Sequence, residues 1–133
     1  MAVPVIVDAN FMTVPAQFGV DVFAEAERVL EQRVEFIMLS SVLKEIEVIS
    51  EGSKSQTDKR AFGIARSLAD RCKQVDSIHP QLPVDDQLLE YTISVNGVLA
   101  TNDRNLRINA RKKGVPVLFL RGKKRLVLDG FKV

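Results

Sequence analysis

The sequence predicts an α/β fold in which helices cover both sides of a central parallel sheet. Short apolar runs alternate with stretches of helical periodicity along almost the whole chain, and this alternation is typical of consecutive β-α-β units. A chain of 133 residues, 46% of them hydrophobic, can bury about two-thirds of its unfolded surface in one core. We therefore expect residues 1–133 to form a single domain.

Four short apolar runs are predicted to be strands, because each is bounded by polar or turn-forming residues. They are residues 3–7, 36–39, 98–100 and 117–120. Residues 74–78 are a weaker candidate for a strand, and 126–128 for an edge strand or hairpin. The strands that lie between predicted helices are expected to run parallel.

Helices are predicted between the strands, where apolar residues recur at helical spacing. They are residues 21–32, a helix containing Glu45, and residues 60–73, 84–95 and 103–113. Ser40 and Ser41 are candidate N-caps for the second of them. The polar segment 51–58 is predicted to be a mobile loop.

Four acidic residues are predicted to meet at one edge of the sheet. Asp8, Asp86 and Asp103 each lie where a strand ends or a helix begins, and Glu45 lies beside the apolar stripe of its helix. Residues just past the carboxyl ends of parallel strands converge on one crevice, which is the usual ligand position in open α/β folds. The four carboxylates would then share one site.

A cluster of four carboxylates calls for a cation, because like charges and partial burial both disfavour ionisation. Oxygen ligands without His or Cys suit Mg²⁺ or Mn²⁺ better than zinc. Each acid also has a structural alternative. Glu45 would then be a solvated edge residue, and Asp103 would favour the helix N-terminus through the helix dipole.

Asp85 and Asp86 compete for the third position of the acidic set. Either side chain can cap the helix that begins there. We assign Asp85 to the cap and Asp86 to the site, because Asp86 shares a helical face with Leu89 and Ile93.

The C-terminal part of the chain is strongly basic. Residues 1–103 contain 9 Lys or Arg and 16 Asp or Glu, a net charge of −7, whereas residues 104–133 contain 10 and 1, a net charge of +9. A basic region beside an acidic metal site indicates a polyanionic substrate, and the alternative is a solvated face. The candidate nucleic-acid-binding residues are Arg104, Arg107, Arg111, Lys123, Lys124 and Arg125.

Cysteine and histidine are too few for other kinds of site. Cys72 is the single cysteine and His79 the single histidine, so neither an internal disulfide nor a His-rich metal site is expected. No apolar run reaches the roughly 18 residues needed to cross a bilayer. We expect a cytoplasmic protein without membrane contact.

Four segments of the chain together resemble the acidic motifs of PIN-domain nucleases. Their order and spacing agree with the family along essentially the full length. Within it, the segment 114–120 followed by basic residues is most similar to the archaeal and eukaryotic branch associated with small-subunit ribosomal RNA processing, and toxin-type PIN nucleases are also similar. The four segments are Val5-Ile6-Val7-Asp8-Ala9-Asn10, Ser41-Val42-Leu43-Lys44-Glu45-Ile46, Val84-Asp85-Asp86-Gln87-Leu88-Leu89 and Ala100-Thr101-Asn102-Asp103-Arg104-Asn105-Leu106.

The resemblance implies a Rossmann-like three-layer α/β/α sandwich and a metal-dependent endoribonuclease that cleaves single-stranded RNA. A water activated by Mg²⁺ or Mn²⁺ would attack the phosphorus, without a side-chain nucleophile. The residues that match the family's metal-binding acids are Asp8, Glu45, Asp86 and Asp103. Asn10, Thr101 and Asn102 match polar positions that we expect to support the metal ligands by hydrogen bonds.

Two further readings come from other classes of protein. A phosphatase with Asp8 as nucleophile would need an acid two positions on, where Asn10 stands. A catalytically inactive RNA-binding scaffold would keep the basic region without needing the acids.

The resemblance also suggests a homodimer, with RNA as substrate and an antitoxin or a ribosome-assembly factor as a further partner. The largely apolar segment 11–18 is a candidate partner or substrate-gating surface, with core packing as the alternative for Phe11 and Phe18.

Overall fold

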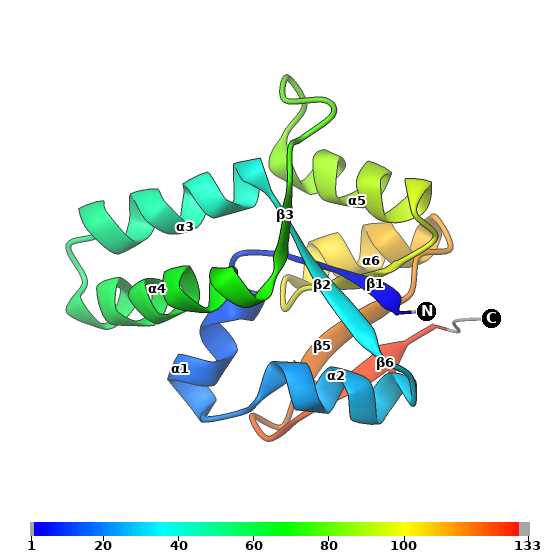
Figure 1. Cartoon of the computed structure of the whole chain (residues 1–133), viewed down its shortest axis with the longest axis horizontal. Helices are drawn as coiled ribbons and strands as arrows, with labels where there is room; N and C mark the ends of the chain where they lie inside the picture. Colours follow the sequence, from blue (N-terminus) through cyan, green and yellow to red (C-terminus); the bar gives the residue numbers. More distant parts are fainter. Residues whose placement is uncertain (1, 131–133) are drawn as a thin grey trace.

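The computed structural model describes residues 2–130. A six-stranded sheet in the order β3-β2-β1-β4-β5-β6 forms its centre (Figure 1). The strands are β1 (Val3–Val7), β2 (Val34–Leu39), β3 (Lys73–Val75), β4 (Val98–Ala100), β5 (Val117–Arg121) and β6 (Arg125–Asp129). The helices are α1 (Val14–Phe18), α2 (Val22–Leu30), α3 (Ser40–Gly52), α4 (Gln56–Leu68), α5 (Val84–Ser94) and α6 (Arg104–Lys112), with 3-10 turns η1 (Phe11–Thr13) and η2 (Ala69–Arg71).

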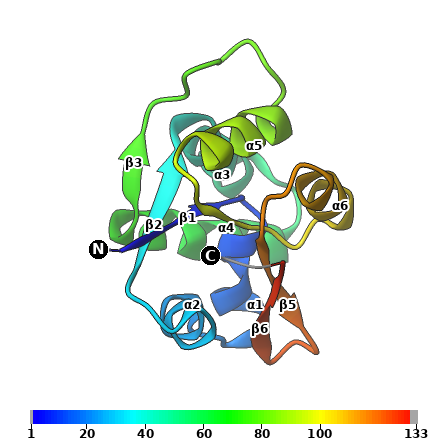
Figure 2. The ribbon, with the colours of Figure 1, turned by 90° about the vertical axis from the view of Figure 1, so that its right-hand side faces the viewer.

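Strands β1 to β5 run parallel, and β6 pairs antiparallel with β5. The prediction of a central parallel sheet is therefore confirmed, with β6 as the antiparallel edge. Helices α2 and α4 lie on one face of the sheet and α5 and α6 on the other (Figure 2), as right-handed crossovers require when the strand order reverses at β1. Within the described residues, no helix is long and apolar enough to cross a membrane.

The centre of the core is the strand pair β1 and β4, whose carboxyl ends carry two of the predicted acids. Val5 pairs with Phe36 of β2 on one side and with Val98 of β4 on the other. Both strands are almost completely buried, which explains their continuous apolar sequence. The approach of β4 to β1 is close at Gly97, where an added Cβ would lie 2.8 Å from the carbonyl oxygen of Pro4.

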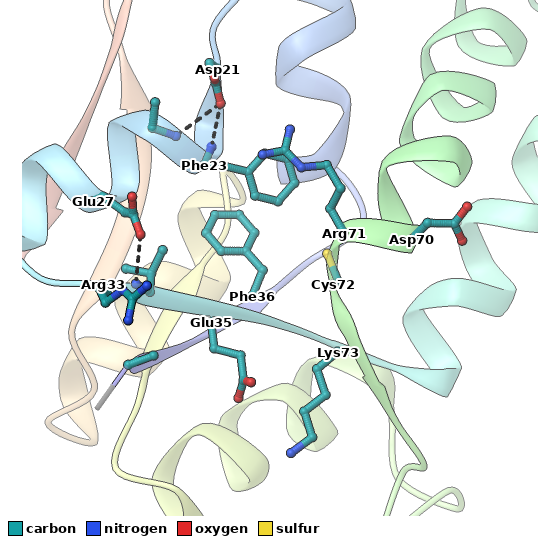
Figure 3. A pocket seen from close by; sticks show the side chains of 13 residues that line it. Asp21, Phe23, Glu27, Arg33, Glu35, Phe36, Asp70, Arg71, Cys72 and Lys73 are labelled. Atoms are coloured by element: carbon teal, nitrogen blue, oxygen red, sulfur yellow. Dashed lines mark hydrogen bonds between the residues drawn. The ribbon is translucent and has the colours of Figure 1, made fainter.

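A large hollow lies away from the acids, between α2, β2 and the short edge strand β3 (Figure 3). It has a volume of about 770 Å³. Phe23 and Phe36 pack in it with ring centroids 4.6 Å apart, and the Arg71 guanidinium lies 3.8 Å from the centre of the Phe23 ring. Cys72 also lines it, and burial raises the pKa of this thiol to about 11.

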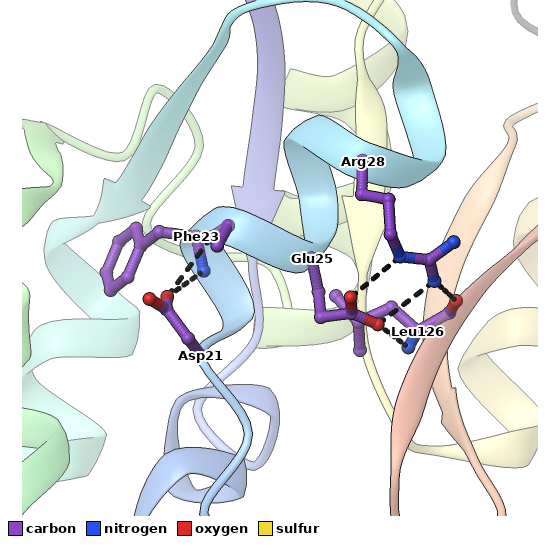
Figure 4. Close-up of polar contacts among 6 residues, drawn as sticks. Asp21, Phe23, Glu25, Arg28 and Leu126 are labelled. Atoms are coloured by element: carbon purple, nitrogen blue, oxygen red, sulfur yellow. Dashed lines mark hydrogen bonds and ion pairs between the residues drawn. The ribbon is translucent and has the colours of Figure 1, made fainter.

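Polar contacts of α2 fix the edge strand β6 to the rest of the molecule (Figure 4). Arg28 and Glu25 form an ion pair of 2.7 Å. Leu126 closes the contact with its main chain, because its amide donates to Glu25 Oε1 at 3.1 Å and its carbonyl accepts from Arg28 at 3.4 Å. The Glu25–Arg28 pair of α2 thus hydrogen-bonds the main chain of β6. Asp21 caps the same helix, because its side chain accepts from the amides of Phe23 and Ala24.

Three local predictions are wrong in detail. Segment 51–58 is a loop only at 53–55, because α3 runs to Gly52 and α4 begins at Gln56. The Ser55 hydroxyl caps α4 by accepting from the Asp58 amide. The helix predicted for 60–73 ends at Leu68, and the strand that follows is Lys73–Val75.

Ser40 and Ser41 do not cap α3, since Leu39 holds the N-cap position without a side-chain hydrogen bond. Their hydroxyls instead contact Ser77 in the loop before α5. The Ser77 amide donates to Ser40 Oγ at 3.1 Å, and the Ser77 hydroxyl donates to Ser41 Oγ at 3.1 Å. These bonds hold the β3–α5 loop against the start of α3.

The segment 11–18 is not a continuous exposed surface. Phe11 and Val14 are fully buried in the core, within η1 and at the start of α1, whereas Phe18 is 38% exposed. Core packing, the alternative reading, holds for Phe11. Phe18 alone of these three remains available to a partner.

Candidate acidic metal site

Asp8 lies directly after β1 and is 8% exposed. Its carboxylate accepts hydrogen bonds from the Ala9 amide at 2.8 Å and from the Thr101 hydroxyl at 2.7 Å. Burial raises the pKa of Asp8 above its usual value, the two hydrogen bonds oppose that rise, and the charges of Asp85 and Asp103 add to it. A nearby cation would stabilise the ionised form of Asp8, which burial and the neighbouring acids disfavour.

Thr101 joins Asp8 to Asp103. It follows β4 and is fully buried, and its hydroxyl oxygen accepts from the Asp103 amide at 3.0 Å while its proton is donated to Asp8. Asp103 is also the N-cap of α6, because its Oδ1 accepts from the Leu106 amide at 2.9 Å. The capping role considered for Asp103 therefore exists, and it occupies one of the two carboxylate oxygens.

Glu45 reaches the same region from α3. Its side chain is solvent-exposed on the flank of the helix, next to buried Val42 and Ile46. Burial of part of the side chain raises the pKa of Glu45, and the charges of Asp8 and Asp85 raise it further. Acids from β1, α3 and α5 therefore act on one another although they lie far apart in the sequence.

The structure brings Asp85 into this set. Burial raises the pKa of Asp85, followed by the charges of Asp103 and Asp86, and Asp85 in turn acts on Asp8 and Glu45. Asp85 does not cap α5, since Pro83 is the N-cap and no side chain closes it. The assignment of Asp85 to the cap is thus wrong, and it is the charge of Asp85 that adds to the raised pKa values of Asp8 and Glu45.

The donor set of this site fits a hard divalent cation. Within residues 2–130, no three or more Asp, Glu, His or Cys side chains are close enough to one another to hold a metal ion as they stand. The carboxylates of Asp8, Glu45 and Asp85 nevertheless interact with neighbouring acids, and their pKa values are raised first by burial and then by the charges of those neighbours. Oxygen donors of this kind suit Mg²⁺ or Mn²⁺.

Asn10 and Asn102 hold the loops that follow β1 and β4. The side-chain oxygen of Asn10 accepts from the Asn102 amide at 3.2 Å, and that of Asn102 accepts from the Leu120 amide of β5 at 2.9 Å. The carboxyl ends of three parallel strands are thereby tied together. We expect this tie to limit how far Asp8 and Asp103 can separate.

The predicted basic residues differ in their surroundings. Arg104 is exposed in the first turn of α6, next to Asp103. Arg107 stacks on Phe119, with its guanidinium 4.0 Å from the ring centre, and lies 4.0 Å from Asp129. Arg111 lies at the far end of α6, where it pairs with Asp129 at 3.3 Å and donates to the Val115 carbonyl at 3.2 Å. Arg111 therefore has a structural role in the described fold.

Lys123, Lys124 and Arg125 lie at the turn between β5 and β6 and are exposed. Because β5 runs parallel to β4, this turn lies at the same end of the strands as Asp8 and Asp103. With Arg104 they are the exposed members of the predicted basic set and are called the basic border below.

Comparison with known proteins defines the family. The family model described as "PIN like domain" matches residues 5–123, so the chain belongs to the PIN-like domain family, as the four acidic segments predict. A curated relative, Ribonuclease VapC4 of Methanocaldococcus jannaschii, is 26% identical over 128 residues, which cover 95% of this chain and 96% of the relative.

Solved structures show the same fold. The structure of the PIN domain endonuclease Utp24 superposes with a TM-score of 0.79 at 23% identity, over 97% of this chain and 92% of that one. A domain of a protein of unknown function from Methanocaldococcus jannaschii superposes with a TM-score of 0.62 at 15% identity, over 91% and 93% of the two chains. The three-layer α/β/α fold implied by the sequence is confirmed.

Proposed function

We propose that this protein is a metal-dependent endoribonuclease that cleaves single-stranded RNA. The observation that carries the proposal is the buried Asp8 carboxylate, which the Thr101 hydroxyl links by hydrogen bonds to Asp103, with Glu45 and Asp85 acting on its surroundings from α3 and α5. Membership of the PIN-like family supports it, since one relative is called a ribonuclease and a structural neighbour an endonuclease. We also propose that residues 1–133 act as one domain.

In this proposal the four carboxylates hold Mg²⁺ or Mn²⁺. Such a cation supplies Lewis acidity, which makes water easier to deprotonate and offsets the charge of the phosphate. Asp8 and Glu45 release any proton they carry when the cation binds, because ligands must be ionised. Thr101 keeps Asp8 oriented through its hydroxyl and holds the main chain of Asp103 in register with it.

The basic border would bind the RNA backbone. Arg104 and the turn residues Lys123 and Lys124 are exposed at the carboxyl end of the strands, where a phosphate approaching the acids needs positive charge. Arg107 and Arg111 contribute less, because both lie near Asp129.

The relatives suggest two biological roles. The name of the curated relative points to a toxin ribonuclease, which would be held by an antitoxin. The structural neighbour Utp24 and the sequence resemblance point to ribosomal RNA processing with ribosome-assembly partners. We propose a homodimer in the cytoplasm for either role, and light scattering that finds only a 14.8 kDa monomer at high concentration would contradict the dimer.

Cleavage of a labelled single-stranded RNA tests the function. We expect cutting with Mn²⁺ or Mg²⁺ and none with a chelator, and a loss of at least about 100-fold in Asp8→Asn and Asp103→Asn. Asn is as good an N-cap as Asp, so Asp103→Asn should keep α6 intact. Equal residual cleavage in all three proteins would indicate contamination, and intact RNA binding would then favour the inactive scaffold.

The pair Asp85→Asn and Asp86→Asn decides the third ligand. Both residues are exposed in the first turn of α5, so the two variants should have similar stability. We expect Asp85→Asn to lose cleavage and Asp86→Asn to retain most of it. The reverse result would restore Asp86, the residue predicted from the sequence.

A further inference from the structure

A groove runs beside α6 and begins next to Asp103. It has a volume of about 470 Å³ and is here called the α6 groove. Arg104, the first residue of α6, follows Asp103 directly and lines the groove, and so does Lys112, the last residue of the helix. The lining residues are Arg104, Arg107, Ile108, Arg111, Lys112 and Asp129.

The part of this lining that α6 supplies is a single stripe of the helix. Its members follow the spacing i, i+3, i+4, i+7 and i+8, which places their side chains on one helical face. Lys112 lies about 12 Å from Arg104 along the helix axis. Because α6 connects the parallel strands β4 and β5, it leads from the carboxyl end of β4 back to the amino end of β5. The α6 groove therefore leads away from Asp103.

The middle of the stripe is held in place by neighbouring side chains. The Arg107 guanidinium lies over the Phe119 ring, 4.0 Å from its centre, and Arg107 Nη1 is 4.0 Å from Asp129 Oδ2. Arg111 Nε is 3.3 Å from the other carboxylate oxygen of Asp129. Asp129 therefore lies beside the two central arginines, and the charges at both ends of the stripe are left uncompensated.

The two ends of the stripe carry cations that are open to a ligand. Arg104 and Lys112 are exposed, and within residues 2–130 neither of them forms an ion pair. The lining as a whole has four cations and one acid, a formal net charge of 4 − 1 = +3. Ile108, between the two ends, is 40% exposed and offers apolar contact. A complementary ligand therefore has negative charges about 12 Å apart and apolar surface between them.

Single-stranded RNA has this chemistry. Its phosphates recur along the backbone, and the riboses and unstacked bases between them can contact side chains. A single phosphate reaches only one end of the stripe. An acidic peptide also matches the charge, but the groove begins at the residue after Asp103, where the proposed nuclease binds the cleaved phosphate. The position of the groove therefore favours RNA.

We propose that the α6 groove binds the stretch of single-stranded RNA on one side of the cleaved phosphate. Arg104 contacts a phosphate close to the acids, and Lys112 contacts a phosphate farther along the strand. This inference rests on the proposed nuclease function and adds the path of the substrate and a binding residue, Lys112, at the far end of that path. Lys112 then contributes only to the binding of RNAs long enough to reach the end of α6.

Lys112→Ala and Lys113→Ala test the groove as a matched pair. Both lysines are exposed at the end of α6 and carry the same charge, but Lys112 lines the groove and Lys113 does not. Binding of a long single-stranded RNA is measured by fluorescence in chelator, over a range of salt. We expect Lys112→Ala to bind severalfold more weakly, with the slope of log affinity against log salt reduced by about one, and Lys113→Ala to bind as wild type does. Thermal melts establish that both variants fold.

The length of the RNA distinguishes a path along α6 from a general attraction between opposite charges. A series of oligonucleotides of increasing length is bound to wild type, Arg104→Ala and Lys112→Ala. We expect Arg104→Ala to weaken binding at every length. Lys112→Ala should weaken it only beyond a threshold length, at which the affinity of wild type also rises severalfold.

Equal effects of Lys112→Ala and Lys113→Ala, or an effect of Lys112→Ala that is the same at every length, would overturn the proposal. No effect of Lys112→Ala at any length would also overturn it and would leave the groove to an acidic protein partner.

Binding in chelator also separates this inference from the proposed function. Absence of cleavage by wild type in Mg²⁺ or Mn²⁺ would count against the nuclease, while the lysine pair and the length series would still decide whether RNA follows α6. If wild type cleaves RNA and Lys112→Ala binds it as wild type does, the nuclease function stands and the proposed path is wrong.

Discussion

The hydroxyl of Thr101 donates a hydrogen bond of 2.7 Å to Oδ2 of Asp8, across 93 positions of the sequence. Both groups are buried at the carboxyl ends of the adjacent strands β1 and β4. The same hydroxyl oxygen accepts the amide of Asp103. One threonine therefore sets the relative position of the first and last acids.

Replacement of Thr101 by valine should impair both folding and cleavage. Valine keeps the shape but leaves the Asp8 carboxylate and the Asp103 amide without this partner, and we expect a loss of about 1–3 kcal/mol in the free energy of unfolding. RNA cleavage should fall at least about tenfold, because Asp8 loses its fixed orientation. Thr101→Ser, which keeps the hydroxyl, is the control. Chemical denaturation and cleavage rates indistinguishable between Val and Ser would argue against this role.

Asp8→Asn should stabilise the protein in the absence of metal. Burial raises the pKa of Asp8 above 3.8, so the folded state binds the proton more tightly than the unfolded chain does. Well below pH 3.8 Asp8 is protonated in both states and does not lower the free energy of unfolding. As pH rises through the raised pKa of the folded state, Asp8 ionises in its buried site and the free energy of unfolding falls. At pH 7 we expect the variant to melt about 2–5 °C higher, with the difference vanishing towards acid pH. A difference that instead grows towards acid pH would contradict this sign.

With Mg²⁺ present, wild type should have the higher Tm and Asp8→Asn the lower. A cation that binds the folded state raises the Tm of wild type, and Asp8→Asn should respond less because one ligand is lost. Calorimetry with and without chelator measures both effects in the same samples.

Gly97→Ala should destabilise the fold by about 1–3 kcal/mol. An alanine Cβ would lie 2.8 Å from the Pro4 carbonyl oxygen and 2.9 Å from Ile6 Cδ1, so β4 could not keep its distance from β1. Gly63 in α4 is the matched control, since a Cβ there meets nothing within 4 Å. Gly63→Ala should stabilise by roughly 0.5–1 kcal/mol through helix propensity. Urea unfolding of both variants tests the contrast, which similar effects in both would refute.

Arg104 and Arg111 should respond differently to alanine substitution. Arg104→Ala is expected to weaken RNA binding and to reduce the slope of log affinity against log salt by about one. Arg111→Ala should instead lower the free energy of unfolding by about 1 kcal/mol, because it releases Asp129 and the Val115 carbonyl. Fluorescence titrations over a range of salt, together with melts, distinguish the two. A salt slope altered only by Arg111→Ala would reverse the assignment.

Cys72 should react slowly with alkylating reagents. Burial raises the pKa of its thiol to about 11, and the thiolate is the reactive form. At pH 7 we expect alkylation at least about 100-fold slower than that of a free thiol of pKa about 8.5. The rate should reach the free-thiol value in denaturant. Rapid labelling of the folded protein would contradict the burial of this side chain.

The positions of the central strands and the edge of the sheet at which Asp8 and Asp103 lie follow from patterns that the sequence shows directly. Buried strands such as 3–7 and 98–100 read as continuous apolar runs, and each is followed by an aspartate within three residues. Parallel pairing then requires both aspartates at one edge. Asp8 and Asp103 could be placed in this way because strand geometry alone determines where they lie.

The choice between Asp85 and Asp86 could not be made in the same way. Both stand in the first turn of α5, and the direction of each depends on where the helix begins. Pro83 rather than Asp85 is the N-cap, a shift that rotates the two side chains about the helix axis. The predicted start of the helix at residue 60 is also too late, since Ser55 followed by Asp58 is a recognisable capping pattern for α4. The contacts of Ser77 with Ser40 and Ser41, and of Asp129 with Arg107 and Arg111, join residues far apart in the sequence, so no local sequence pattern predicts them.

The separation of Asp8 from Asp103 has a consequence for synthesis of the chain. An unfinished polypeptide that has not yet reached β4 can contain Asp8, Glu45 and Asp85, but it lacks Thr101 and Asp103 and the strand that places them beside β1. Asp8 and Asp103 meet only after β4, the fourth of the six strands, has been made and paired with β1. The proposed site is therefore incomplete until the chain has been synthesised as far as Asp103.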